Sequence, residues 1–318
     1  MITMLLAKRI LLAVAMLVAA AALVYPFAPA AKADGEAKAH KTDWLYKAKW
    51  GVMFHYTDPW QGAGTIEEWN KRLDGFDVDG LAKQLKELGA GYLMITSKHG
   101  GKFTLAPNAA FEKANPGCTP KRDLIGDLAE ALDKQGIGLM LYYATGMGID
   151  KPKVANVTAE VIGEWSKKYG KKVRGWWLDN NVGDQDLQKL IADAARSGNP
   201  DTVVGFSPPK APSPRRNSPQ DDYTAGNTHA PGPARCSGRF VDGAQWHILT
   251  YLGNNWAGVH KKAGMRFSPE RAAGMTAGAL SKGGVVTWDV KPLASGLIDP
   301  AYLPGLKAIG EAAAKIQR

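Results

Sequence analysis

The 318-residue sequence is 45% hydrophobic and 22% charged and contains ten tryptophans, a composition that excludes a disordered chain. Its length suits one large domain or two small ones, and one (β/α) barrel of about 250 residues would nearly fill it. The two cysteines, Cys118 and Cys236, exclude a disulfide-stapled scaffold and a cysteine-rich zinc module. Their positions leave open whether they form a disulfide.

Residues 1–33 have the pattern of a secretory signal peptide. Lys8 and Arg9 precede an apolar run at 10–24, and the small-residue triplet AKA follows at 31–33. The apolar run is short for a membrane span, which needs roughly 20 residues. We therefore expect a secreted or periplasmic protein that keeps no stable membrane anchor after cleavage.

The net charge favours acidic partners outside the cell. The whole chain has 40 basic and 30 acidic residues, a charge of +10. The expected leader contains three basic residues and no acid, so the chain from Asp34 onward keeps 37 basic residues and a charge of +7. For an exported protein we expect no nucleic-acid partner and consider an acidic polysaccharide, although the charge can also serve solubility alone. The sequence leaves the oligomeric state open.

Apolar runs mark seven predicted strands after a polar stretch at 34–42, which is predicted to be a flexible lead-in. Most of these runs are continuously apolar, as is typical of parallel strands that are buried on both faces. We expect residues 43–318 to form one domain. The predicted strands cover 51–56, 91–96, 138–143, 173–178, 202–206, 246–251 and 284–288.

Helical patterns separate most of these strands, with apolar residues recurring at intervals of three and four. The predicted helices cover 79–88, 123–135, 157–168, 184–197, 269–280 and 302–316. Residues 207–220 contain five prolines and are predicted to form a long loop.

Strands that alternate with helices predict a parallel sheet with helices outside it. Seven strands are one short of a closed ring of eight. We therefore predict an α/β fold of the (β/α)8 (TIM) barrel type with an irregular second half. An open doubly wound sheet is the alternative, although no G-x-G-x-x-G motif opens its first unit.

Histidines, aromatic residues and carboxylates follow the predicted strands, where a barrel collects its functional groups. Aromatic faces can pack against a sugar ring, while histidines and acids bond its hydroxyl groups. This pattern predicts a glycan site. The sequence contains no H-x-H or H-E-x-x-H motif, either of which would predict a metal site. It also contains no G-x-S-x-G motif, which would predict a serine hydrolase. The strand-end residues are His55, Tyr56, Ser97, Lys98, His99, Tyr142, Tyr143, Asp179, Trp288 and Asp289.

Five segments resemble glycoside hydrolase family 29, the retaining α-L-fucosidases. They occur in the order found in that family and extend over nearly the whole chain after the leader. The resemblance implies a (β/α) barrel and a carbohydrate substrate, and we expect neither a cofactor nor a metal. The segments are WLYKAKWGVMFH at 44–55, PKRDLIG at 120–126, GLMLYY at 138–143, VRGWWLD at 173–179 and SKGG at 281–284.

The resemblance implies specific roles for three residues. Asp179 corresponds to the nucleophile, and His55 and His99 correspond to histidines that bind the sugar. Tyr143 and Trp60 are further candidates for the pocket wall. In a retaining mechanism the nucleophile attacks the anomeric carbon, and a second carboxyl acts first as acid and then as base.

The chain departs from the family at two positions of chemical importance. The family motif KHHDGF is KHGGKF here, so Gly100 and Gly101 replace a histidine and an acid. The acid/base glutamate of some members corresponds to Asn227, and an amide cannot donate a proton as a carboxylic acid does. Asp289 and Asp222 are therefore predicted as alternative acid/base groups. The chain also ends after the barrel, so no C-terminal β-sandwich is expected.

The sequence is compatible with three functions. A glycoside hydrolase of the α-L-fucosidase type is favoured. Asn227 would suit a barrel that binds carbohydrate without cleaving it. The positive charge and the basic residues Lys210, Arg215 and Arg216 in the proline-rich loop would suit a lyase that acts on an acidic polysaccharide.

Overall fold

The computed structural model describes residues 39–144, 152–179, 184–207, 214–229, 236, 238–258 and 264–318. Residues His40–Arg318 form one compact unit. The expected leader, most of the expected lead-in, and Lys210 lie outside the described residues.

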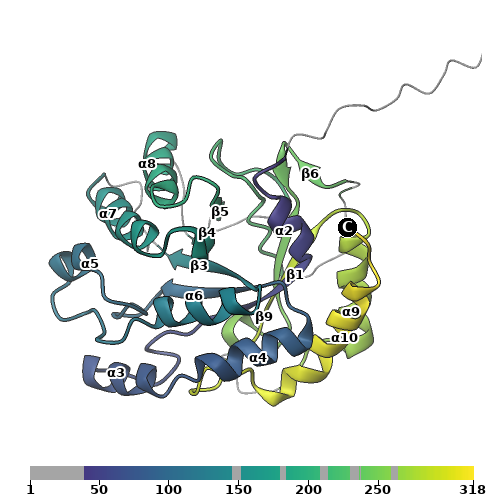
Figure 1. Ribbon diagram of the computed structural model, residues 1–318, viewed down its shortest axis with the longest axis horizontal. Coiled ribbons are helices and arrows are strands. Elements are labelled where there is room, and N and C mark those ends of the chain that lie inside the picture. The colour runs from purple at the N-terminus through teal and green to yellow at the C-terminus, as the bar shows by residue number, and fades with distance from the viewer. Residues whose placement is uncertain are drawn as a thin grey trace, which may run out of the picture. The chain divides into compact units, whose positions relative to one another are not determined.

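Seven parallel strands form one curled sheet, with the helices that follow them against its outer side (Figure 1). Each strand corresponds to a predicted one. The sheet order is β5-β4-β3-β2-β1-β9-β8. The bounds are β1 (Trp50–Phe54), β2 (Tyr92–Lys98), β3 (Gly138–Ala144), β4 (Val173–Asp179), β5 (Val203–Ser207), β8 (His247–Tyr251) and β9 (Val285–Asp289).

The segment 222–228 occupies the place of the missing eighth strand, between β5 and β8. The Asp222 N–H donates to the Val204 carbonyl of β5 at 2.9 Å. On the other side, the Leu249 N–H of β8 donates to the Gly226 carbonyl at 3.0 Å. The ring is therefore continuous, and the prediction of a (β/α)8-type barrel with an irregular second half is confirmed.

Six of the helices match predicted ones, and three short helices were not predicted. One of the three, α3, begins at a capping box in which the Thr65 hydroxyl accepts a hydrogen bond from the Glu68 N–H at 3.2 Å. A small hairpin joins β6 (Phe240–Val241) to β7 (Ala244–Gln245). The helices are α2 (Asp43–Ala48), α3 (Ile66–Asp74), α4 (Val78–Leu88), α5 (Ala109–Ala114), α6 (Leu124–Lys134), α7 (Pro152–Tyr169), α8 (Gln185–Arg196), α9 (Pro269–Leu280) and α10 (Leu303–Ala314).

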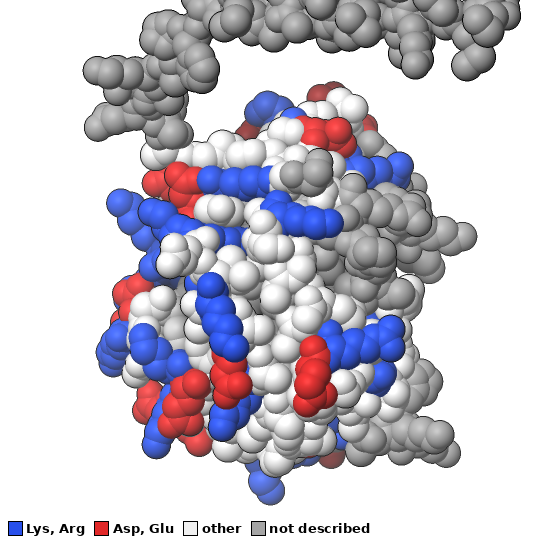
Figure 2. Space-filling view, turned by 90° about the vertical axis from the view of Figure 1, so that its right-hand side faces the viewer, with Lys and Arg blue, Asp and Glu red and all other residues white. Residues whose placement is uncertain are grey.

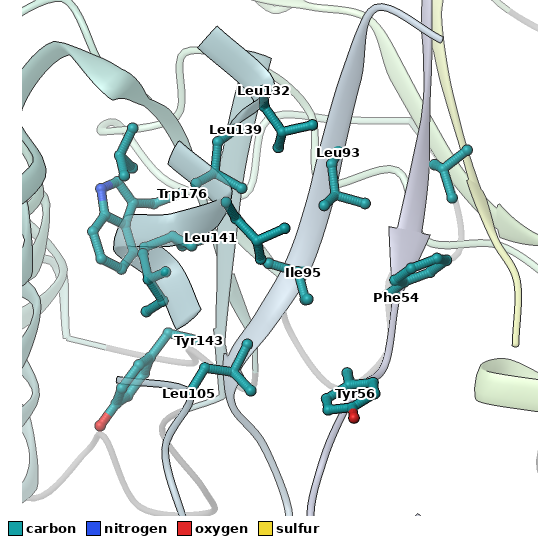
Figure 3. Close-up of a cluster of buried hydrophobic side chains, with 14 of the residues drawn as sticks. Phe54, Tyr56, Leu93, Ile95, Leu105, Leu132, Leu139, Leu141, Tyr143 and Trp176 are labelled. Carbon is teal, nitrogen blue, oxygen red and sulfur yellow. The ribbon is translucent and has the colours of Figure 1, made fainter. Parts of the chain in front are cut away.

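The strands carry two apolar layers because successive side chains point to opposite faces. The outer layer packs between strands and helices and includes Phe54, Leu93, Leu141 and Trp176 (Figure 3). The inner layer fills the barrel and includes methionines of β1, β2 and β3. Trp165, Trp176 and Trp246 are all fully buried.

The surface carries its charge in a mixed pattern. On the face shown in Figure 2, lysine and arginine side chains lie among aspartate and glutamate side chains. Cys118 and Cys236 are both free thiols. Across the parts of the chain that the structure describes, the helices include none with the length and apolar character that a membrane span requires.

Candidate active site

A cavity of about 260 Å³ opens at the carboxyl ends of the barrel strands. The structure brings Asp179, His55, His99 and Trp60 together in it, four residues that the sequence analysis had singled out. Asn227, on the segment that replaces the eighth strand, lies there too. The lining residues are Met53, His55, Trp60, His99, Tyr142, Trp177, Asp179, Asn227, Leu249 and Trp256.

Asp179 ends β4, and its carboxylate is held by a neighbouring tyrosine. The Tyr142 hydroxyl donates to Asp179 Oδ2 at 2.6 Å, and His99 Nε2 lies 3.9 Å from the same oxygen. Burial, and then the negative charge of Asp179, raise the pKa of Tyr142 well above its usual value, so the hydroxyl keeps its proton. Among the described lining residues, Asp179 provides the sole carboxylate.

His55 is oriented by an aspartate that lies behind it. His55 Nδ1 is 2.9 Å from Asp289 Oδ1, and the Ala257 N–H donates to Asp289 Oδ2 at 2.6 Å. Asp289 is 1% exposed and does not line the cavity. Both carboxylate oxygens of Asp289 are therefore hydrogen-bonded. Since Nδ1 of His55 faces Asp289, Nε2 is the nitrogen with which His55 can bind a ligand.

His99 is held in its neutral form. Its burial, assisted by the nearby His55 and Lys98, lowers the pKa of His99 to about 3. In the described part of the chain, His99 Nδ1 and Asn227 Oδ1 are buried without a hydrogen-bond partner. Buried polar atoms are normally paired, so these two are the groups that a polar ligand in the cavity would satisfy.

Aromatic rings form much of the cavity wall. The Tyr142 and Trp177 ring centroids lie 4.6 Å apart, and the Trp60 and His99 centroids lie 5.2 Å apart. Trp177 and Trp256 line the cavity, although sequence reasoning did not select them. Ring faces of this kind suit the C–H surface of a sugar.

Of the two strand-end tyrosines, Tyr142 lines the cavity, and Tyr143, the predicted candidate for the pocket wall, does not. Tyr143 lies in the outer layer (Figure 3). Its ring centroid is 6.4 Å from that of Trp165 in α7. Neighbouring residues of a strand point to opposite faces. Because β3 is apolar on both faces, its sequence pattern does not distinguish the inner tyrosine from the outer one.

Asp222 lies at the amino end of the barrel, away from the cavity. Its Oδ2 accepts hydrogen bonds from Arg196 Nη2 at 2.8 Å and from the Val204 N–H at 2.9 Å. These contacts join α8, β5 and the segment 222–228. Asp222 therefore helps to hold the segment 222–228 against β5, where it closes the barrel. Asn227 is the residue of this segment that lines the cavity.

Gly101 leaves room for a carboxylate from another loop. A Cβ atom on Gly101 would lie 1.7 Å from Asp58 Oδ1. Asp58 is 4% exposed, and its Oδ2 accepts a hydrogen bond from the Lys102 N–H at 2.8 Å. The departure from the family motif at this position therefore has a structural reason, because the loop after β1 fills the space of the missing side chain.

Within the described residues, no group of three or more histidine, cysteine, aspartate or glutamate side chains is arranged to hold a metal ion. The cavity instead combines one carboxylate, two histidines and a wall of aromatic rings. This arrangement can bind a sugar and present a nucleophile to its anomeric carbon.

Solved structures with the same barrel include known fucosidases. An α-L-fucosidase of family GH29 from Bacteroides thetaiotaomicron has a TM-score of 0.66 at 18% identity, over 91% of this chain and 76% of that one. Isoenzyme 1 from Paenibacillus thiaminolyticus has a TM-score of 0.63 at 18% identity, over 86% and 74%. An endo-fucoidan hydrolase of glycoside hydrolase family 107 has a TM-score of 0.66 at 14% identity, over 85% and 53%.

Sequence comparison assigns the family. A Caenorhabditis elegans protein with a provisional alpha-L-fucosidase name is 34% identical over 70 residues. This match spans 22% of the present chain and 14% of the length of that relative. The sequence model of the alpha-L-fucosidase family matches residues 30–314. The chain therefore belongs to the alpha-L-fucosidase family, glycoside hydrolase family 29.

Proposed function

We propose that this protein is an exported hydrolase that cleaves an α-L-fucoside or a closely related glycoside with retention of configuration. The observation that carries this proposal is the Asp179 carboxylate, bonded to Tyr142 and set among histidines and tryptophans in one cavity. The leader pattern at 1–33 supports export.

Asp179 is the proposed nucleophile. Its carboxylate attacks the anomeric carbon, the bond to the leaving-group oxygen breaks, and that oxygen takes up a proton. Water then attacks the covalent glycosyl-enzyme and releases Asp179, so two inversions give net retention. Neutral His99 and the Nε2 atom of His55 are placed to bond sugar hydroxyls.

For the proton donor we look beyond Asp289 and Asp222, because Asp289 lies behind His55 and Asp222 is bonded to Arg196, and neither lines the cavity. We propose His229, which lies two residues beyond Asn227 in the sequence. His229 Nδ1 is 3.1 Å from the Tyr251 hydroxyl, and its ring centroid lies 6.1 Å from that of Trp256 in the cavity wall. An imidazole can donate and then accept a proton near neutral pH.

A barrel that binds a glycan without cleaving it is the second candidate. One observation favours it, namely that Asp179 provides the sole carboxylate among the described residues of the cavity wall. The two candidates differ in whether a reducing sugar appears when a bound glycoside is incubated with the protein.

The proposal is tested with 4-nitrophenyl α-L-fucoside as substrate. Asp179→Asn should lower kcat by at least about 10³-fold while sugar binding persists, because the amide is a poor nucleophile. Asp201→Asn, an exposed aspartate before β5, is the matched control and should keep full activity. Binding without turnover by the parent protein would favour the second candidate.

The role of His229 is tested by the leaving group. His229→Gln should slow a phenyl fucoside by about 10²- to 10⁴-fold. It should affect release of 2,4-dinitrophenolate far less, because that group leaves without a proton. An equal loss on both substrates would contradict the proposed role.

A further inference from the structure

A second cavity, of about 540 Å³, lies beside the first between the ends of β2 and β3 and the helices α5 and α7. Three lysines line it, Lys98, Lys102 and Lys153, and no aspartate or glutamate is among its lining residues in the described chain. We call it the lysine cavity. A group of like charges that line one cavity without an acid among them attracts anions.

The ammonium group of Lys98 is incompletely bonded. Within the described residues its Nζ donates to the Gly101 carbonyl at 2.6 Å, and none of the three lysines has a carboxylate oxygen within 4 Å. An ammonium group carries three donors. Burial lowers the pKa of Lys98, with Asp58 acting in the opposite sense. A bound anion would supply the missing acceptors.

The two cavities share the ends of two strands. His99 and Tyr142 line the first cavity, while their chain neighbours Lys98 and Tyr143 line the lysine cavity. The two cavities are therefore separated by the ends of β2 and β3. A glycan whose terminal sugar lies beside Asp179 can thus carry a substituent or a neighbouring sugar into the lysine cavity.

We propose that the lysine cavity binds an anionic group, a sulfate ester or a carboxylate, of a glycan whose terminal sugar occupies the Asp179 cavity. Lys102 and Lys153 are exposed and can close on the anion, while Lys98 is fixed at the inner wall. The identity of the glycan rests on the proposed function, whereas the anion preference rests on the lysines alone.

The anion preference can be measured without any catalysis. The Cys118 thiol lines the lysine cavity and is free. In a Cys236→Ser background, an anionic methanethiosulfonate reagent should modify Cys118 faster than a cationic one of similar size, where each rate is taken relative to that of the same reagent with free cysteine. The ratio should fall with added salt and in the double variant Lys102→Ser/Lys153→Ser, whose substituted side chains are exposed.

A matched control removes three exposed lysines of α4 and the C-terminal helix region, Lys83, Lys307 and Lys315. This variant loses one more positive charge than the double variant, yet its ratio of anionic to cationic labelling rates at Cys118 should equal that of the parent. Equal rates with the two reagents, or an equal effect of both sets of substitutions, would overturn the proposed anion site.

The glycan is tested by calorimetric binding to Asp179→Asn protein. The probes are a sulfated fucan oligosaccharide, its desulfated form, and a uronate-containing oligosaccharide. The double variant should bind the sulfated or the uronate probe about tenfold more weakly, and the arm affected identifies the anion. The desulfated probe should be unaffected. Faster anionic labelling of Cys118 together with unchanged glycan affinities would overturn the glycan assignment and leave the proposed hydrolase untouched.

Discussion

The hydrogen bond between Tyr142 and Asp179 sets the charge at the centre of the cavity. A protonated tyrosine that donates to a carboxylate favours the ionised carboxylate. The bond is short, at 2.6 Å, as is typical of a hydroxyl that donates to a carboxylate, and Tyr142 is almost fully buried. Tyr142 therefore orients the proposed nucleophile, and its hydrogen bond favours the ionised form of that carboxyl group.

Tyr142→Phe should lower kcat/KM on an aryl fucoside by about 10- to 100-fold. This is the loss expected when a hydrogen bond to a charged group is removed. Tyr169→Phe is the matched control. Its hydroxyl donates to Asp123 Oδ1 at 2.8 Å, between α7 and α6 and away from the cavity. Equal activity of Tyr142→Phe and the parent would contradict the role of this bond.

Sequence reasoning located Asp179, His55 and His99 because each ends or directly follows an apolar strand. It did not give the direction of side chains on strands that are apolar on both faces, so it selected Tyr143 and missed Trp177. It also did not show that Asp289 is engaged by His55, because that contact joins residues 234 positions apart.

At the scale of secondary structure, the barrel is closed by a segment that has no strand pattern. The segment 222–228 makes isolated bridges to Gln245 and Leu249 and no regular ladder. Its backbone passes so close to β8 that a Cβ atom on Gly226, whose φ is 67°, would lie 2.0 Å from the His247 carbonyl oxygen. The sequence predicted seven strands and could not predict this eighth element, which depends on such a contact.

His247 connects this segment to the sheet inside the barrel. Its Nδ1 donates to the Thr224 carbonyl at 3.0 Å, and its Nε2 accepts from the Thr287 hydroxyl of β9 at 2.7 Å. The second bond requires the neutral ring, because a protonated Nε2 has no lone pair with which to accept. Complete burial lowers the pKa of His247 to about 4.

The free energy of unfolding should therefore decrease as the pH falls from 6.5 towards 4. In that window the unfolded chain binds a proton at His247 and the folded chain does not, whereas above pH 6.5 neither does. Between pH 7 and pH 5 the loss from this residue is about 2 kcal/mol.

Urea unfolding of the parent and of His247→Gln at both pH values measures this difference. The variant is expected to be less stable overall, but its decrease between pH 7 and pH 5 should be smaller by about 2 kcal/mol. Equal decreases in the two proteins would show that His247 is not the titrating group.

At the scale of the whole molecule, the expected export would expose the net positive charge of the protein to acidic glycans outside the cell. Without residues 1–33 the chain keeps a charge of +7. The basic side chains on the face shown in Figure 2 lie among acidic ones. The lysine cavity, by contrast, has no acid among its described lining residues. Binding of an acidic glycan should therefore depend on that cavity more than on the overall charge.

Mass spectrometry of the exported protein should find an N-terminus near Asp34. The reason is the AKA triplet at 31–33, which has the small residues that a signal peptidase accepts. Ala33→Arg should block cleavage and leave a heavier product. An intact Met1 in the exported parent protein would contradict both the leader and the charge of +7.

The central claim is that Asp179 forms a covalent bond to the sugar. Intact-mass spectrometry after incubation with 2-deoxy-2-fluoro-L-fucosyl fluoride tests it most directly, because the 2-fluorine slows hydrolysis of the glycosyl-enzyme while fluoride leaves readily. The expected result is a mass increase of one fluorofucosyl group, mapped by peptide analysis to Asp179 and absent from Asp179→Asn. Turnover of an aryl fucoside with an inverted product and no adduct, or an adduct on another residue, would contradict it.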